Sequence, residues 1–248
     1  MQAMFAPNAP HSLAGPHASR LQLSRVGRDH PHRREVEAFI AEVYRQRYGA
    51  QLRSFLPHLL AYRDAAGALQ AAVGLRYARE GRLFVEQYLD TEAQCEVARV
   101  QQVPVPRERL VEVGNFASRT PGHAREVIVR LTALLHHEGL RWVLFAATKQ
   151  LRNTFDRLHL ATVPLAPADP ARLNAGENAW GCYYDAKPVV LLGDLASGYA
   201  YLQRRAAETA DAQNDAAPHG SARSSAADSS ERHWLLHTVL RSACVPGV

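Results

Sequence analysis

The stretch from Leu110 to Leu160 constrains the fold of this chain more than any other. An apolar run over 110–117 leads into a turn, 118–125, that is rich in Gly, Pro and Ser and carries two arginines. Apolar residues then recur at helical spacing up to Gly139, which is placed to end a helix. The continuous apolar run 142–147 is typical of a strand covered on both faces. The pattern therefore predicts strand, turn, helix, buried strand and, over Leu151, Phe155 and Leu158, a second short helix.

The turn is the first candidate for chemistry. The first amides of a helix lack intrahelical partners, and the helix dipole adds partial positive charge there. Gly122 allows close approach of a ligand, and Arg119 and Arg125 add fixed charge, so the turn is suited to a phosphate or diphosphate. It lacks the Gly-Lys-Ser/Thr of a P-loop and the Gly-x-Gly-x-x-Gly of a dinucleotide site. An ordinary surface turn with solvated arginines is the alternative, and both interpretations stay open.

The residues before this stretch predict a layered α/β arrangement. A helix is expected over 34–48, ended by Gly49. Strands are expected over 59–63 and 69–78, with a hairpin turn at 64–67. Leu83 to Val85 continues the apolar pattern of these strands.

Further elements follow from the same signals. Thr91 to Gln94 fits a capping box for a helix running toward Val100. Two more strands are expected over 161–165 and 188–192, and a short helix over 199–208. The order of elements predicts one mixed sheet with helices on both faces.

The chain divides by composition into four parts. Residues 1–20, rich in Pro, His, Ala and Ser, are expected to be disordered, and 21–200 to form the folded domain. Residues 201–230 are expected to be a flexible linker, and 231–248 a C-terminal helix.

Charge and cysteine content indicate the kind of partner and the cellular compartment to expect. The formal net charge of +5 suits an acidic partner: a cofactor phosphate, an acidic carrier protein or a membrane surface. No nucleic-acid recognition motif is present. Cys95, Cys182 and Cys244 are far apart and odd in number, which favours free thiols and no metal site. No apolar run reaches the length of a signal-peptide core at the N-terminus or of a membrane span, so a cytoplasmic protein is expected.

Several segments resemble known families. Arg119 to Ala124, RTPGHA, is similar to the Arg/Gln-x-x-Gly-x-Gly/Ala loop of the GNAT N-acetyltransferases and lies, as there, between a strand and a helix. From about Arg34 to Asp194 the chain resembles the thermostable hemolysin family, through EQYL (86–89), EVGNFASRTPGHAR (112–125), PLAPADPARL (164–173) and WGCYYDAKP (180–188). That family looks like a branch of the acyltransferase fold close to acyl-homoserine-lactone synthases.

The resemblance implies a mostly antiparallel sheet with a V-shaped splay between two central parallel strands. It also implies a pantetheine thioester donor, acyl-CoA or acyl-carrier protein, that binds in the splay while a small amine attacks directly. The expected partners are thus a small-molecule amine and an acyl-carrier protein, with a homodimer as an assembly to test. The donor site carried over onto this chain comprises Phe116, Ala117, Ser118, Arg119, Thr120, Gly122, His123, Ala124, Arg125 and Thr148.

Three residues are candidates for the chemistry. Glu112 is the preferred base, because burial beside the splay would raise its pKa, although a structural carboxylate paired with an arginine is equally compatible. By strand alternation it is expected to share a face with Gly114 and Phe116. Glu86 is a second candidate, with a structural role favoured, and the role of Asn115 is open because a bulge would change its face.

One departure from the acyltransferase pattern stands out. The Asn and Tyr of Asn-x-x-Ala-x-x-x-Tyr correspond here to Thr148 and Phe155, and a phenylalanine cannot protonate a leaving thiolate. This makes a carrier-protein or long-chain acyl donor more attractive than acetyl-CoA. A membrane-active lytic protein and a catalytically silent acyl-CoA-binding regulator remain the alternatives.

Overall fold

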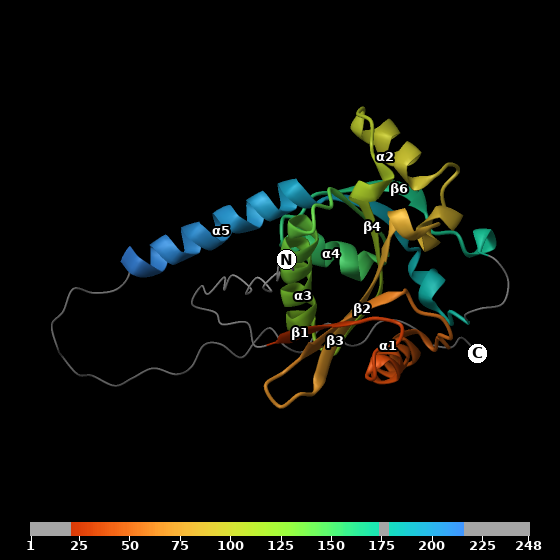
Figure 1. The fold of residues 1–248 in the computed structure, drawn as a ribbon, viewed down its shortest axis with the longest axis horizontal. Helices are drawn as coiled ribbons and strands as arrows, with labels where there is room; N and C mark the ends of the chain where they lie inside the picture. Colours follow the sequence, from red (N-terminus) through yellow and green to blue (C-terminus); the bar gives the residue numbers. More distant parts are fainter. Residues whose placement is uncertain (1–20, 174–178, 216–248) are drawn as a thin grey trace, which may run out of the picture. The chain divides into compact units, whose positions relative to one another are not determined.

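The structure, a computed structural model, describes residues 21–173 and 179–215 (Figure 1). Of the described residues, those up to Ala210 belong to one compact unit, and 211–215 to another. In chain order the elements are β1 (Gln22–Val26), α1 (Arg33–Tyr48), β2 (His58–Arg63), β3 (Leu69–Tyr77), the 3-10 turns η1 (Ala78–Glu80) and η2 (Phe84–Gln87), α2 (Ala93–Gln101), η3 (Arg107–Arg109), β4 (Leu110–Ser118), α3 (Pro121–His137), β5 (Trp142–Ala147), α4 (Lys149–Arg157), β6 (Thr162–Pro167), η4 (Pro170–Arg172), η5 (Tyr183–Ala186), β7 (Val189–Asp194) and α5 (Leu195–Asp215).

The strands form one seven-stranded sheet in the order β1-β2-β3-β4-β5-β7-β6. The β4–β5 pair is parallel, because α3 carries the chain back across the sheet between them. The five other neighbouring pairs are antiparallel. The predicted mixed, mostly antiparallel sheet is confirmed.

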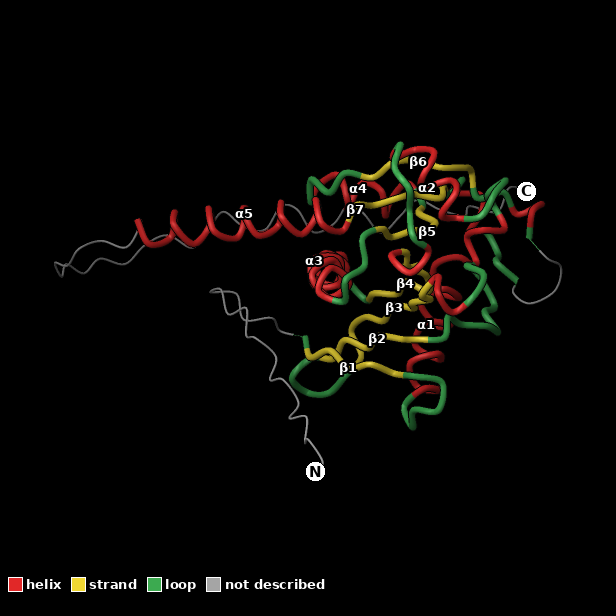
Figure 2. Tube along the Cα trace, turned by 45° about the horizontal axis from the view of Figure 1, so that its top comes forward, coloured by secondary structure: helices red, strands yellow, loops and turns green. Residues whose placement is uncertain are grey.

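Helices α1 and α3 cover opposite faces of the sheet, as the tube view shows (Figure 2). The apolar face of α3, with Val127, Leu131 and Leu135, packs on one side of β2, β3 and β4. On the other side Val36, Phe39 and Ile40 of α1 pack with alternate residues of the same strands. Because successive side chains of a strand point to opposite faces of the sheet, each of these strands contributes residues to two separate cores.

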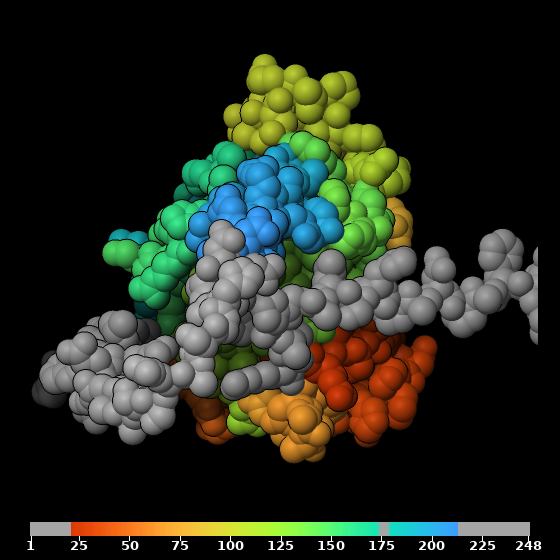
Figure 3. All heavy atoms as spheres, turned by 90° about the vertical axis from the view of Figure 1, so that its left-hand side faces the viewer, coloured from red at the N-terminus to blue at the C-terminus, as the bar shows by residue number. Residues whose placement is uncertain are grey.

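Around η2 a further core joins the β4–β5–β7 part of the sheet to α2, which stands out at the top of the space-filling view (Figure 3). Val85, Tyr88 and Leu89 contribute to it, together with Val97 of α2. The segment 83–93 is thus packed into the domain although it forms no strand.

Most predicted elements are confirmed, and β5 has the predicted bounds. Gly49 caps α1 with a φ of 65°, and Gly139 follows α3 with a φ of 79°. Strands β6 and β7 lie where two late strands were expected.

Several predictions are wrong in detail. Strand β1 was missed, because Gln22–Val26 has no regular apolar alternation. Helix α2 exists but its N-cap, Glu92, makes no side-chain cap bond, so the capping box is absent. Helix α5 continues to Asp215, beyond the predicted end at 208. The expected disordered segment 1–20 and C-terminal helix 231–248 lie outside the described residues, and the predicted domain boundaries stay predictions.

Candidate active site

The two parallel strands separate along their length. Strands β4 and β5 pair only from Leu110 to Glu112, opposite Trp142 to Leu144. Beyond these three residues β4 stays bonded to β3 and β5 to β7, so the edges that face each other are left open. The predicted V-shaped splay is therefore present.

A cavity fills the splay and is lined from both faces of the sheet. On the α3 side its walls include Ile128 and Leu131, and α4 adds Leu151 and Phe155. On the α1 side they include Tyr44. Because α1 and α3 lie on opposite faces, the cavity passes through the sheet between β4 and β5. Of the predicted donor-site residues, Phe116, Ser118, Thr120, Ala124 and Thr148 line it, whereas Ala117, Arg119, Gly122, His123 and Arg125 do not.

The start of α3 lies at this cavity but offers few free amides. Pro121 has no N–H, and the amides of His123 and Ala124 bond to the side chain and carbonyl of Thr120. Only the Gly122 amide of this first turn is without a partner among the described residues. The space over Gly122 is open, since a Cβ there would meet only the Thr120 hydroxyl at 3.9 Å. Anion binding here would depend on one amide, the helix dipole and neighbouring cations.

The nearby basic side chains differ in how they are held. Arg119 donates from Nε to the Leu69 carbonyl (2.9 Å) and lies 5.2 Å over the Phe39 ring, so it is partly committed to the domain. Arg125 is exposed, and His123 keeps a buried Nδ1 without a hydrogen bond. Two cationic or titratable groups thus remain available beside the cavity.

A bulge in β4 places Asn115 in the left-handed region, with a φ of 48°. Its Oδ1 accepts the Leu56 amide (2.8 Å), so the side chain anchors the segment before β2. The bulge also puts Phe116 with the α3-side core, while Glu112 lies on the α1 side beside η2. The expectation that Glu112 and Phe116 share a face is wrong, because alternation does not continue through a bulge.

Glu112 is 2% exposed and makes no ion pair within 21–173 and 179–215. Its carboxylate accepts the backbone amides of Phe84 (2.7 Å) and Val85 (3.0 Å), at the start of η2. Burial raises the pKa of Glu112 to about 7, against the opposing effect of those amides and of Arg76. The carboxyl group thus titrates in the range of a general base, but it is not part of the cavity wall.

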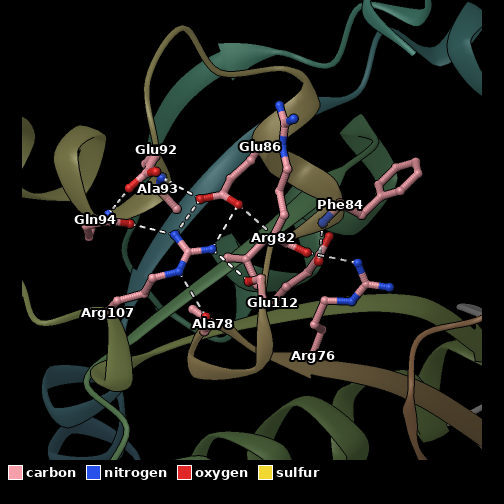
Figure 4. Close-up of polar contacts among 12 residues, drawn as sticks. Arg76, Ala78, Arg82, Phe84, Glu86, Glu92, Ala93, Gln94, Arg107 and Glu112 are labelled. Carbon is pink, nitrogen blue, oxygen red and sulfur yellow. Dashed lines mark hydrogen bonds and ion pairs between the residues drawn. The ribbon is translucent and has the colours of Figure 1, made fainter. Parts of the chain in front are cut away.

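Glu86 lies close by and is held differently (Figure 4). Arg107 donates to both of its oxygens, at 2.7 and 3.0 Å, and the amides of Leu83 and Ala93 donate to them as well. Burial acts to raise its pKa, but the bonds from Arg107 and the two amides outweigh burial, and the net pKa is lowered. This geometry fits a structural carboxylate better than a base.

The cavity has a wall that sequence reasoning did not assign to the site. Tyr44, Arg47 and Tyr48 of α1 line it together with Tyr183. In the sequence, Tyr44 and Tyr48 fall on the apolar face of the predicted helix, which favours a core role, and Tyr183 is more typical of packing than of an acyl pocket. Their polar tips on an apolar helix face were the available signal.

The Tyr183 part of this wall is clamped onto α1. Gly181 has a φ of 53°, and a Cβ there would come within 1.9 Å of the Tyr48 carbonyl oxygen. That oxygen also accepts the Cys182 amide (2.8 Å). A residue other than glycine at 181 would push η5 away from the helix.

Comparison with solved structures supports a GNAT-like fold. TofI in a ternary complex with an inhibitor and MTA has a TM-score of 0.50 and 18% identity, over 74% of this chain and 96% of TofI. The CoA-dependent acyl-homoserine lactone synthase BjaI, with SAM and isopentyl-CoA, gives 0.51 and 11%, over 75% and 90%. A weaker similarity, which does not enter the fold assignment, is to FeeM, an N-acyl amino acid synthase from uncultured soil microbes, with a TM-score of 0.48 and 12% identity over 72% of this chain and 93% of FeeM. A search of curated proteins finds no match.

The splayed sheet and the likeness to TofI and BjaI define a GNAT-like α/β fold. Within that class, the chain belongs to the thermostable hemolysin family, whose model matches residues 26–199. Among the described residues, no helix has the length and apolar character needed to cross a membrane.

Proposed function

We propose that this protein transfers an acyl group from a pantetheine thioester, acyl-CoA or an acyl-carrier protein, to the amine of a small molecule. The observation that carries the proposal is the cavity in the β4–β5 splay, lined from both faces of the sheet. A donor on the α3 and α4 side and an acceptor on the α1 side could meet there. Holding both reactants in one cavity supplies proximity and orientation, a large part of catalysis of acyl transfer.

The donor is assigned to the α3 and α4 side. The open backbone edges of β4 and β5 offer amides and carbonyls to a pantetheine arm. The N-termini of both helices border the cavity through Thr120 and Thr148, and Arg125 and Lys149 are exposed nearby. The dipoles of these two helices and the positive charges of the two exposed side chains would attract the phosphates of the donor.

The acyl chain is assigned to the apolar depth of the cavity. Ile128, Leu131 and Leu135 of α3 face Val143 and Phe145 of β5 there. Phe155, at the place of the usual tyrosine, stacks on Phe145 with ring centroids 4.8 Å apart. An apolar wall in place of a hydroxyl favours a longer acyl chain over acetyl.

Carbonyl polarisation is assigned to the bulge of β4. The backbone of Phe116 lies beside the Tyr44 hydroxyl, and both residues line the cavity. With a donor bound, the Phe116 amide and the Tyr44 hydroxyl would face the thioester oxygen and stabilise the oxyanion that forms on attack.

Glu112 is proposed to accept the proton of the attacking amine, because its pKa of about 7 lets it take up a proton near neutral pH. Since it does not line the cavity, the proton would reach it through an intervening water or hydroxyl. Glu86 and Asn115 are proposed as positioning residues. Glu86 accepts hydrogen bonds from the amides of Leu83 and Ala93, and Asn115 accepts one from the amide of Leu56.

The test measures donor binding and thiol release with purified protein, acyl-CoA of several lengths, acyl-carrier protein and a panel of amines. The matched variants are Ala124→Glu, at the cavity mouth, and Ala200→Glu, on exposed α5. Acidic residues near a helix start do not destabilise it, so Ala124→Glu is expected to fold yet lose donor binding at least tenfold by charge repulsion. Ala200→Glu is expected to match the wild type.

Three other outcomes would decide against the proposal. Donor binding without thiol release for any amine would indicate a silent acyl-donor-binding regulator. Leakage of liposomes that Glu112→Gln leaves unchanged, with no donor binding, would indicate a membrane-active protein. Equal donor affinity in wild type and Ala124→Glu would place the donor outside this cavity.

A further inference from the structure

Arg47 is a cation at the cavity without an assigned role. It lines the α1 side of the cavity, is exposed, and makes no ion pair or hydrogen bond among the described residues. Its neighbour Arg45, on the same helix, is paired with Glu42 at 2.7 Å. A guanidinium without a carboxylate partner beside a cavity is a ready site for a carboxylate ligand.

The wall next to Arg47 is aromatic. The ring centroids of Tyr48 and Tyr183 are 5.2 Å apart in an edge-to-face arrangement, and the Tyr44 ring lies 5.7 Å from Tyr48 and 6.3 Å from Tyr183. All three rings line the cavity. Such a wall binds an apolar or aromatic group by contact and ring stacking.

The spacing within α1 relates the cation to the proposed reaction centre. Arg47 follows Tyr44 by three residues, so the two side chains leave the same side of the helix one turn apart. Tyr44 meets the backbone of Phe116 at the bulge, where the thioester is assigned. A ligand held by Arg47 would thus have its carboxylate only a short distance from the point of attack.

We propose that Arg47 and the wall formed by Tyr44, Tyr48 and Tyr183 are the acceptor subsite, and that the acceptor is an α-amino acid with an apolar or aromatic side chain. The carboxylate binds Arg47, the side chain contacts the tyrosines, and the neutral amine attacks the thioester carbonyl. The new amide bond forms as the carbon–sulfur bond breaks, the amine proton passes to the base, and the sulfur leaves with the bonding electrons as a thiolate, which then takes a proton from water. This inference rests on the proposed function.

The experiment compares phenylalanine with phenethylamine, which lacks only the carboxylate, as acceptors for the full-length protein. Wild type is expected to use phenylalanine with the lower KM. Arg47→Ala is expected to raise the KM for phenylalanine roughly tenfold or more, as for loss of a charge-assisted bond, and to leave phenethylamine nearly unchanged. Arg45→Ala, at an exposed position two residues earlier in the same helix, is the matched control. It is expected to leave the KM values for both acceptors unchanged.

A second readout is independent of turnover. Calorimetric titration of phenylalanine, without donor, is expected to show binding that Arg47→Ala weakens by the same factor and Arg47→Lys restores in part. Glycine is expected to bind more weakly than phenylalanine, since it cannot contact the tyrosine wall.

Distinct results separate this inference from the proposed function. Equal loss with both acceptors, or loss of acyl-CoA affinity in Arg47→Ala, would mean that Arg47 serves folding or the donor, and would overturn the inference while acyl transfer stands. If no amine is acylated, the proposed function fails, and phenylalanine binding that does not depend on Arg47 would sink the inference as well.

Discussion

Two buried carboxylates bind backbone amides of the same short segment, 83–93, yet their pKa values are shifted in opposite directions. Glu112 binds the amides of Phe84 and Val85 at the start of η2, and Glu86 binds those of Leu83 and Ala93 around it. Both are nearly inaccessible, at 2% and 4% exposure. The pKa of Glu112 is raised to about 7, whereas that of Glu86 is lowered.

The difference comes from the cation. Glu86 has a two-point contact with the Arg107 guanidinium, which also donates to the Ala78 and Gly81 carbonyls and so is itself held in place (Figure 4). Glu112 accepts hydrogen bonds from two amides but has no ion pair with any described residue. The two hydrogen bonds do not offset the free-energy cost of burying its charge. Two glutamates that bind amides of the same segment thus become a fixed anion and a titrating acid.

Breaking the ion pair should have the largest effect. Arg107→Ala leaves Glu86 buried without a countercharge, so the free energy of unfolding at pH 7 is expected to fall by about 4 kcal/mol. Chemical denaturation measures this. Arg99→Ala, which removes the exposed Arg99–Glu96 pair, is the control and should cost well under about 1 kcal/mol. Similar losses in both variants would show that Glu86 is not stabilised by its arginine.

Removing the titrating acid comes next. The pKa of Glu112 is about 7 in the folded protein and near 4.5 unfolded, so the folded state holds an extra proton between these values. Its stabilising contribution is full below pH 4.5 and is lost as pH rises through 7. The loss amounts to roughly 3 kcal/mol, and Glu112→Gln should abolish it.

The measurement is the difference in unfolding free energy between wild type and Glu112→Gln from pH 4.5 to 8. In the proposed reaction, the same variant should lower kcat/KM and remove its acid limb near pH 7. An unchanged pH dependence of both stability and rate would contradict the assignment of a titrating Glu112.

The smallest effect concerns Arg76, which lies opposite Glu112 in the register of β3 and β4 and whose positive charge lowers the pKa of Glu112. Arg76→Gln should therefore raise the pKa of Glu112 above about 7, with a stability change under about 1 kcal/mol at pH 8. Carbon-13 NMR of the labelled carboxyl group reads this pKa directly. Arg79→Gln, an exposed arginine over the Tyr77 ring, should leave the carboxyl titration where it is.

The core of the fold was predictable because its signals are local. The strand 110–117, the helix ending at Gly139 and the strand 142–147 follow from apolar period and one glycine, and the structure matches them within a few residues. The splay followed from the resemblance to the acyltransferase fold, since no residue pattern encodes how far two parallel strands stay paired.

The site was less predictable because its details depend on distant contacts. The bulge at Asn115 is held by Leu56, whose side chain lies 2.9 Å from where Cβ atoms would stand on Gly74 and Gly114. No local sequence pattern predicts that Leu56 contacts the middle of both β3 and β4, so the face of Phe116 was predicted wrongly. The amides at the start of α3 were likewise expected to be free, but Thr120 binds two of them. Its side chain accepts the His123 amide as an N-cap, and its carbonyl accepts the Ala124 amide.

The opening of the sheet between β4 and β5 also has a kinetic consequence for the proposed reaction. Reactants that approach from opposite faces do not compete for one entrance, and both can be present before any bond changes. Initial rates measured against each substrate in turn should then give intersecting double-reciprocal lines, whereas a modified-enzyme intermediate would make those lines parallel.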